Sequence, residues 1–487
     1  MKVLKGNSGN SVLLAVVKAF TTVSGILSTM IMSHALSLEM YGTFSQTNLI
    51  VTTATNVTAL GLVDAVNYFY NRSNDEKIQK IYINTIMGFQ TITGIIAGLL
   101  IIVLSNNLVE YFNNPLLLSF FWLIAFRPLF ANLNVSLQYL QVSIGKAKSV
   151  AIRNAFFAVL RLVVYAIAAL ILQDITIVLI AFLAFEIIIT IFFGYTFVKE
   201  KFIIKPYKIK WSKTKEILGY SIPMGIYVLT NSLCRDIDKM LIGGWYSTDK
   251  YAIYANCATL LPFDIVSASF LTILIPILTR YFGEKDYVHG RILFKNYLKI
   301  GYYTAFTFTI ASMILSKEMI LILYGEKYLT GQSIFILYTI VDMVKFANMS
   351  IVLSASGKTK TLMWCSLASL VANAGCNILF YHIFGFIGPA IATVFVTVIL
   401  TAVLAGMSAK ALETSIWTLV DWKEFIMFIS ELSIVGVFCY IVKKWMENIK
   451  MNSIIILILL GGIYVGGILL LNKKKIFVTM KEINDLH

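Results

Sequence analysis

Runs of about 20 apolar residues recur along nearly the whole chain and are separated by short polar stretches. At a rise of about 1.5 Å per residue, a helix of that length crosses a hydrocarbon core of about 30 Å. The runs are continuous and do not alternate polar with apolar residues, which favours helices over barrel strands. We therefore expect about fourteen transmembrane helices, near 10–36, 43–69, 82–104, 116–140, 150–172, 175–198, 217–243, 251–279, 296–316, 332–355, 360–382, 385–409, 424–442 and 452–472.

The composition agrees with a polytopic membrane protein. The 487 residues are 58% hydrophobic and 13% charged, with a mean hydropathy of +0.81, whereas a soluble protein carries roughly a quarter charged residues. The polar stretches are too short to hold a soluble domain. The first apolar run carries Lys18 and lacks a small-residue cleavage site, so we expect a retained first helix rather than a signal peptide.

The net charge of +15 is distributed unevenly. Most of the 40 Lys and Arg residues fall in the termini and in alternate loops, the pattern of the positive-inside rule with both termini cytoplasmic. The charge therefore indicates the topology of the chain in its membrane, with attraction to anionic inner-leaflet lipid, rather than nucleic-acid binding. Segment 443–450 is expected outside and is nevertheless basic, which runs against the rule.

Two halves of the chain resemble each other. Ser37-x-Glu39-x-Tyr41 matches Ser247-x-Asp249-x-Tyr251 at an offset of 210, and the Gly-Lys-x-Lys sequence at 145–148 recurs at 357–360, an offset of 212. Six helices per half give a parallel repeat about an axis along the membrane normal, with substrate between two bundles. The predicted divisions are an N-terminal six-helix bundle, a basic cytoplasmic linker, a C-terminal six-helix bundle, and two further transmembrane helices with a cytoplasmic tail, at 1–198, 199–216, 217–409 and 410–487.

Several cations lie inside the expected helices. A charge at a helix centre costs roughly 2.5–3.5 kcal/mol, so these side chains should face protein or water. A cavity with several cations suits a pyrophosphate, because Arg pairs bidentately with phosphate oxygens. The alternatives are snorkelling for Lys18, Lys239 and Arg153, which lie near helix ends, and structural ion pairs for the deep cations. The candidate substrate-binding residues are Arg127, Arg161, Lys345, Arg235 and Lys18.

Carboxylates also lie inside the expected helices, where they often serve as proton or sodium sites. Asp264 leads because Pro262 precedes it, and a proline break frees a carbonyl that could join an ion site. A competing interpretation pairs the acids at 236 and 238 with Lys239 and Arg235 in salt bridges, and Asp342 with Lys345. The candidate ion-coupling residues are Asp264, Glu186, Asp236, Asp238 and Asp342.

No catalytic constellation is visible in the sequence. Asp236-Ile237-Asp238 matches the DxD pattern of glycosyltransferases, but residues two apart on a helix point about 200° apart and cannot grip one ion. The four histidines form no cluster, and the cysteines show no metal-ligand spacing. We expect a transporter rather than an enzyme, with no metal site and no cofactor beyond a coupling H+ or Na+.

Four stretches resemble one known family. SHALSLEMYGTFS (33–45) is similar to the end of the first helix in bacterial polysaccharide exporters, and 235–260 resembles their seventh-to-eighth helix junction. LILYGEKYLTG (321–331) resembles the outer segment before the tenth helix. Residues 354–393 resemble a stretch with a Gly-Lys turn, an Asn-bearing helix and a Gly-x-x-Gly-x-Ala-x-Ala-Thr motif, although Pro389 replaces its first alanine. The chain thus resembles oligosaccharide flippases of the multidrug/oligosaccharidyl-lipid/polysaccharide exporter superfamily.

This resemblance implies translocation of an undecaprenyl-pyrophosphate-linked repeat unit across the bacterial inner (plasma) membrane. The product would be O-antigen (lipopolysaccharide), capsule or exopolysaccharide, with a polysaccharide polymerase and glycosyltransferases as partners. A murein-precursor lipid is also a possible cargo. A drug/cation antiporter of the same superfamily is the first alternative, and the deep cations count against it. The second is a membrane-embedded polysaccharide polymerase or ligase, which usually needs a larger outer loop.

Overall fold

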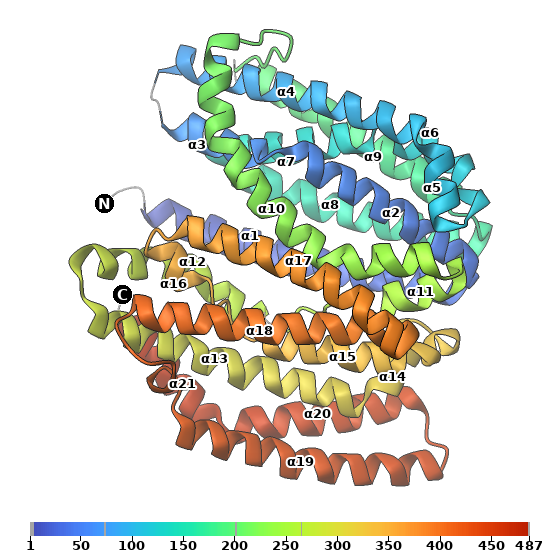
Figure 1. The fold of residues 1–487 in the computed structure, drawn as a ribbon, viewed down its shortest axis with the longest axis vertical. Coiled ribbons are helices and arrows are strands. Elements are labelled where there is room, and N and C mark those ends of the chain that lie inside the picture. Colours follow the sequence, from blue (N-terminus) through green and yellow to red (C-terminus); the bar gives the residue numbers. More distant parts are fainter. Residues whose placement is uncertain (1–3, 73–74, 200–201, 264, 486–487) are drawn as a thin grey trace. The chain divides into compact units, whose positions relative to one another are not determined.

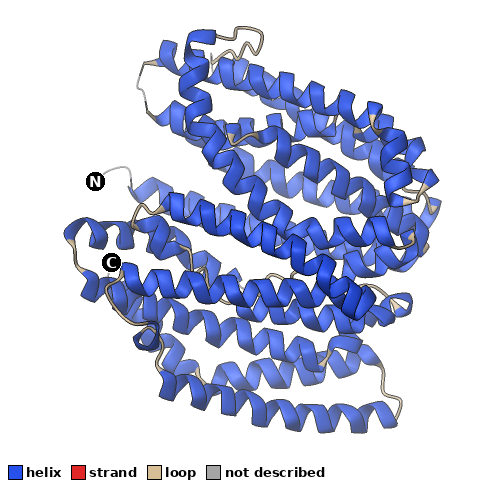
Figure 2. Ribbon diagram, viewed as in Figure 1, coloured by secondary structure: helices blue, strands red, loops and turns tan. Residues whose placement is uncertain are grey.

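The computed structural model describes residues 4–72, 75–199, 202–263 and 265–485, and every regular element in these ranges is a helix (Figure 2). Two compact units, Met1–Ile253 and Tyr254–His487, emerge from the packing of the backbone. The helices that lie wholly in the first unit are α1 (Leu4–Ala35), α2 (Leu38–Ala59), α3 (Leu62–Asn71), α4 (Glu76–Val103), α5 (Ser105–Phe112), η1 (Pro115–Phe120), α6 (Phe121–Ile124), α7 (Arg127–Ser143), α8 (Ala147–Ala166), η2 (Ile167–Leu172), α9 (Thr176–Lys199) and α10 (Trp211–Trp245).

A short helix, α11 (Thr248–Cys257), runs across the boundary between the units. The helices of the second unit are α12 (Ile265–Glu284), α13 (Tyr287–Ile314), α14 (Ser316–Leu323), η3 (Glu326–Gly331), α15 (Gln332–Val344), α16 (Ile351–Ala355), α17 (Thr359–Phe384), η4 (Gly385–Ile387), α18 (Gly388–Ala411), η5 (Ile416–Thr418), α19 (Trp422–Asn448), α20 (Ser453–Leu471) and α21 (Lys473–Asp485) (Figure 1).

The predicted all-α, multi-pass architecture is confirmed. The described residues contain eight helical stretches long and apolar enough to cross a membrane, and up to eleven spans when each of three bent helix pairs counts as one. One of the eight stretches, Thr359–Ala411, contains both α17 and α18, which pack side by side. The count of fourteen spans stays a prediction.

Several expected helices are broken, each for a local reason. Pro128 lies in the first turn of α7 and cannot donate a hydrogen bond to the preceding turn, so the chain bends by 42° before Arg127. The break near Pro262 is also present, because α11 ends at residue 257 and α12 begins at 265. The expected helix 43–69 is also bent, by 41° between α2 and α3, at Gly61, where φ is +69°.

The expected helix 332–355 is not continuous, so that prediction is wrong. It is interrupted between α15 and α16, at residues 345–350. Side-chain hydrogen bonds hold the interruption open: the Tyr297 hydroxyl accepts from the Asn348 amide at 2.9 Å, and Asn348 Oδ1 accepts from the Ser350 amide at 3.0 Å. An Asn side chain that caps its own backbone competes with helix in this way.

The helix boundaries of the two halves show the internal repeat. α4 and α13 have the same length and start 211 residues apart, as do α5 and α14, and η1 and η3. α9 and α18 match at an offset of 212. Gly145 and Gly357 have φ of +83° and +73° and end their helices with the same pair of backbone hydrogen bonds, the Schellman arrangement that favours glycine. The two halves therefore share one local structure.

The predicted domain boundaries concern the repeat and stay a prediction. Packing places the division elsewhere, at 253/254, because α10 packs on α2, α3 and α4 within the first unit. α10 occupies the place in the second repeat that α1 has in the first. α10 thus belongs to the second repeat by sequence and to the first unit by packing.

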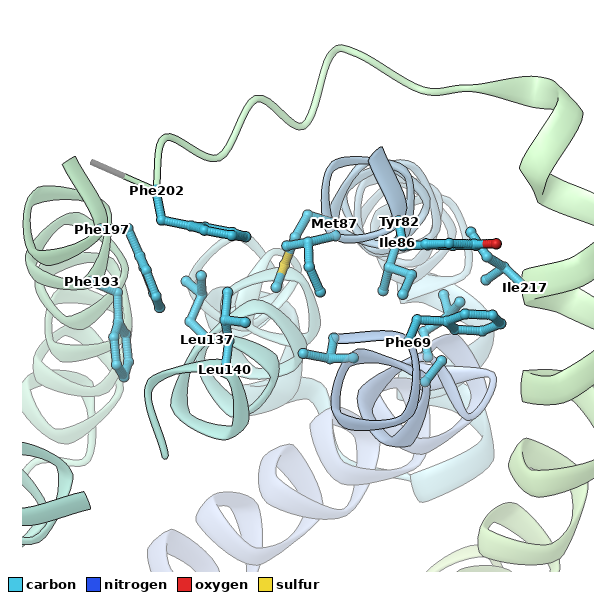
Figure 3. Packing of buried hydrophobic residues seen from close by; sticks show 14 residues of the cluster. Phe69, Tyr82, Ile86, Met87, Leu137, Leu140, Phe193, Phe197, Phe202 and Ile217 are labelled. Carbon is cyan, nitrogen blue, oxygen red and sulfur yellow. The ribbon is translucent and has the colours of Figure 1, made fainter. Parts of the chain in front are cut away.

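The basic segment before α10 is bound to the first unit over its described part. The Lys205 amide donates to Asn84 Oδ1 at 2.7 Å, and the Lys210 amide donates to Thr85 Oγ1 at 3.1 Å. Gly88 permits this approach, because a Cβ there would lie 2.4 Å from the Pro206 carbonyl oxygen. Phe202 inserts into an apolar cluster with side chains of α3, α4, α7 and α9 (Figure 3).

In the second unit, α19 and α20 pack side by side and both contact α13 (Figure 1). Their contact is an aromatic cluster that includes Tyr303, Phe428 and Tyr464. The two helices expected beyond the repeat are therefore packed against a helix of the repeat itself.

Candidate functional site

A polar cavity of about 380 Å³ lies within the first unit, between α1, α7, α8 and α9. Each helix contributes a face: small hydroxyl residues from α1, amides from α7, arginines from α8 and a carboxylate from α9. The polar lining residues are Thr21, Ser24, Ser28, Asn134, Gln138, Arg153, Asn154, Arg161 and Glu186. A cavity that brings several polar side chains together between apolar helices is a candidate location for a hydrophilic substrate.

The small residues of α1 let the cavity form next to a tight helix contact. Ser24 Oγ donates to the Ala158 carbonyl at 3.0 Å, and Ser28 Oγ donates to the Ser24 carbonyl at 2.8 Å. Small residues at helix contacts allow the backbones of membrane helices to approach closely. α1 and α8 consequently form one wall, from which the longer side chains of α8 reach into the cavity.

Arg153 is buried at this cavity, with 8% of its surface exposed. Its Nη2 donates to Gln138 Oε1 and to Asn154 Oδ1, both at 2.8 Å, and its guanidinium lies 4.1 Å from the centre of the Phe193 ring. Its Nη1 has no hydrogen-bond partner among the described residues. A buried donor without a partner costs free energy, so this nitrogen has an unmet need for an acceptor next to the cavity.

Arg127 and Glu186 form an ion pair beside the cavity. Arg127 Nη2 lies 3.2 Å and Nε 3.4 Å from Glu186 Oε1. Arg127 is in the first turn of α7, where the helix dipole disfavours a cation, and the carboxylate offsets that cost. Glu186 Oε2 is buried and has no hydrogen-bond partner in the described part of the chain.

Phe182 connects the second arginine of the cavity to this pair. Its ring lies 5.4 Å from the Arg161 guanidinium and 4.9 Å from that of Arg127. Both distances are in the range of a cation–π interaction. Arg161 is exposed and has no hydrogen-bond or ion-pair partner among the described residues. The structure therefore brings together three of the predicted residues, Arg127, Arg161 and Glu186.

The arrangement has the chemistry of an anion site. Arg153 and Arg161 line the cavity with one carboxylate, Glu186, which is already paired with Arg127. Guanidinium groups suit phosphate oxygens because of their planar fork of donors. Asn134, Gln138 and Asn154 add amide groups that can bind hydroxyls.

The other predicted residues of the first unit lie elsewhere. Lys18 is exposed and does not line the polar cavity. Arg235 is exposed on α10. Asp236 pairs with Lys239, at 3.6 Å, which is one of the salt bridges weighed as the alternative. Asp238 is buried, with 1% of its surface exposed. Their assignment to substrate or ion stays a prediction.

The remaining predicted residues belong to the second unit. Lys345 is exposed at the end of α15, so it does not lie in mid-helix as expected. Asp342 Oδ2 accepts a hydrogen bond of 2.9 Å from the Leu261 amide, in the break that precedes α12. Asp264 lies outside the described residues. The roles of all three stay predictions.

Sequence reasoning missed Arg153, Asn134, Gln138 and Asn154. Arg153 was expected to snorkel, because the helix was drawn from residue 150, whereas α8 begins at Ala147. A signal was present: Asn134 and Gln138 are four residues apart, and Arg161 follows Asn154 by seven, so each pair lies on one helix face. An apolar-run search discards such polar stripes.

Comparisons with known proteins agree with this fold. Residues 31–332 match the family described as "Polysaccharide biosynthesis protein". A probable lipid II flippase MurJ of Rickettsia prowazekii (strain Madrid E) is 25% identical over 189 residues, which cover 36% of this chain and 35% of that protein. The chain thus spans about a third of the length of this curated relative.

Solved structures show the fold over a longer range. A lipid II flippase MurJ in an inward closed conformation is similar with a TM-score of 0.74 at 15% identity, covering 96% of this chain and all of that one. An inward-facing multidrug resistance MATE family transporter of the MOP superfamily gives 0.65 at 12% identity, covering 83% and 98%. The family match agrees with the resemblance of the sequence motifs to bacterial polysaccharide exporters, and the solved structures show the fold. The chain belongs to the polysaccharide biosynthesis protein family, and it has the fold shared by flippases and multidrug transporters of the MOP superfamily.

Proposed function

We propose that this protein is a flippase that translocates an undecaprenyl-pyrophosphate-linked oligosaccharide repeat unit by alternating access. The destination would be O-antigen, capsule or exopolysaccharide, with both termini cytoplasmic in the inner membrane of a bacterium. A polymerase and glycosyltransferases would act on the same lipid-linked intermediate and are the expected partners.

The observation that carries this proposal is the polar cavity of the first unit. Its two arginines, of which Arg153 has an unpartnered Nη1, offer donors to a pyrophosphate. Its three amides offer partners to sugar hydroxyls. A cationic drug would be repelled by this lining, which counts against the antiporter alternative.

The lipid-linked cargo needs a driving force, and Glu186 is the carboxylate best placed to couple it. One of its oxygens pairs with Arg127, and the other is buried without a hydrogen-bond partner among the described residues. A proton or a sodium ion at the second oxygen would weaken the pair with Arg127. The role of Asp264, Asp236, Asp238 and Asp342 as further ion sites remains part of this proposal, as does that of Arg235, Lys345 and Lys18 in substrate binding.

Complementation tests the cavity directly. Arg153→Ala and Arg161→Ala are each expressed in a strain that lacks its own repeat-unit flippase, and the polymer made is compared at equal protein level. Arg280→Ala is the control, because Arg280 is an exposed arginine of α12. Both cavity variants should lose most of the polymer, and Arg→Lys should restore only part. Full polymer from both alanine variants would contradict the proposal.

A murein-precursor lipid is the second candidate cargo, and the similarity to lipid II flippases favours it. The two cargoes would share the pyrophosphate and differ in the attached sugar. A strain depleted of its lipid II flippase distinguishes them, since rescue of growth there, without rescue of polymer in the first strain, would assign the murein precursor.

A further inference from the structure

The last helix, α21, begins one residue after the apolar helix α20 ends. Asn472 separates them, and its side chain donates both to the Ile468 carbonyl at 3.1 Å and to Glu431 Oε2 at 2.7 Å. α20 is long and apolar enough to cross a membrane. The start of α21 is therefore held at the end of a membrane span, close to the bilayer surface.

One face of α21 is fixed against α13 and α19. Thr479 and Ile483 are buried, each with 1% of its surface exposed. Asn296 Nδ2 of α13 donates to Glu482 Oε2 at 2.9 Å, and Lys475 Nζ lies 3.5 Å from Glu431 Oε1 of α19. These contacts determine the rotation of α21 about its axis.

The opposite face carries lysines beside large apolar side chains. At about 100° per residue, positions 474, 477, 478 and 481 point away from Thr479 and Ile483. Phe477 is 68% and Val478 53% exposed. Lys473, Lys474 and Lys481 are exposed and form no ion pair among the described residues. Asp485, in the last turn, is the acid on this side.

We propose that this outward face of α21 binds the surface of an anionic bilayer. Lysines on a helix favour phospholipid headgroups of negative charge, and Phe477 and Val478 can insert among the upper parts of the acyl chains. Position decides for a bilayer rather than a soluble partner, because the preceding residue caps a membrane span. The opposite face of α21, which contacts α13 and α19, would connect these helices to the bound bilayer surface.

The test uses the full-length chain in nanodiscs of phosphatidylcholine alone and of phosphatidylcholine mixed with phosphatidylglycerol. Backbone hydrogen exchange of residues 473–485 is measured by mass spectrometry. We expect slower exchange with the anionic lipid, and loss of that difference in high salt because exposed charges are screened. Exchange that is equal in the two bilayers would overturn the proposal.

Charge and apolar variants separate the contributions. K473Q/K474Q/K481Q should lose the lipid-dependent protection, whereas K208Q/K210Q/K215Q, which removes the same charge from exposed lysines near the start of α10, should keep it. Phe477→Ser should reduce it in the anionic bilayer. Because these side chains are exposed, the thermal stability in detergent should not change. A lipid-dependent protection that survives in K473Q/K474Q/K481Q would show that these lysines do not bind the anionic lipid, and would overturn the proposal.

Discussion

Arg127 Nη2 lies 3.2 Å from Glu186 Oε1, and this ion pair joins the first turn of α7 to the middle of α9. The side chains are 9% and 19% exposed, so either charge would be left with little water if its partner were removed. The pair also sits where α7 restarts after the bend at Pro128.

Removing one member of this pair should destabilise the protein. We expect Glu186→Gln to cost about 3 kcal/mol, because it leaves Arg127 buried without a counter-charge. The double variant Arg127→Gln/Glu186→Gln should recover part of that loss, which thermal unfolding in detergent can measure. The single variant Arg127→Gln completes the comparison. A loss of stability in the double variant that equals the sum of the losses in the two single variants would show that the two charges are not coupled.

The orientation in the membrane can be tested with single cysteines in a variant whose five native cysteines are replaced by serine. Cysteines at Asn106 and Thr330, both exposed, should react with an impermeant thiol reagent applied to intact cells, and one at Tyr207 should not. Asn106 is in α5 and Thr330 is in η3. The stretch from α5 to η1 in the first repeat matches the stretch from α14 to η3 in the second. Labelling of the cysteine at 207 from outside would reverse the topology.

Lys443 forms a buried ion pair within segment 443–450, the basic segment that runs against the positive-inside rule. Its Nζ lies 2.8 Å from Glu318 Oε2 and donates to the Ile314 carbonyl at 2.7 Å, and the two side chains are 6% and 1% exposed. Lys444 and Lys317 both pair with Glu447. These pairs offset part of the positive charge of the segment, since Glu318 neutralises Lys443 and Lys444 shares Glu447 with Lys317.

Lys443→Met should lower the stability by about 3–5 kcal/mol, because Glu318 would stay buried and unpaired. Lys444→Met is the matched control, since that side chain is 56% exposed and a surface pair contributes about 0–1 kcal/mol. Lys443→Met/Glu318→Gln should recover most of the loss. The measurement is again thermal unfolding, and a neutral Lys443→Met would contradict the structural role of the pair.

Gly61 allows α10 to approach the bend between α2 and α3. A Cβ at Gly61 would lie 2.1 Å from the Ser221 carbonyl oxygen and 2.6 Å from the Gly225 amide, and φ is +69°. Gly61→Ala should therefore lower the yield of folded protein sharply. Gly25→Ala, in helix α1 with nothing within 4 Å, should be neutral or slightly stabilising. Normal yield of both would contradict the tight contact.

Much of the fold followed from the sequence because membrane helices are governed by local rules. Long apolar runs must be helical, since backbone groups in lipid have to be satisfied within the segment. The bend beside Arg127 could be anticipated from Pro128, because proline acts on its own turn. The repeat could be seen from Gly145 and Gly357, whose left-handed φ angles reflect a requirement of the helix end itself.

The site followed only in part. Arg127, Arg161 and Glu186 could be named because a deep charge is costly wherever it lies, but their pairing through Phe182 depends on the packing of α7, α8 and α9. Arg153 was not named as a candidate site residue, because its closeness to the end of the expected helix predicts an easy route to water for its side chain. In the structure that route is closed by Phe193 and by the partners Gln138 and Asn154.

The sequence by itself determined the helical, membrane-spanning class, the internal repeat and the existence of buried charges, because each depends on a residue and its near neighbours. Tertiary structure alone decided which charges meet, which are exposed, and that α10 packs with the first unit. Those properties depend on helices that are far apart in the sequence: Arg127 and Glu186 are separated by 59 residues, Lys443 and Ile314 by 129, and Asn56 of α2 and Ser232 of α10 by 176. The sequence reveals that a charge within a membrane helix costs free energy, whereas the packing of the helices decides which partner offsets that cost.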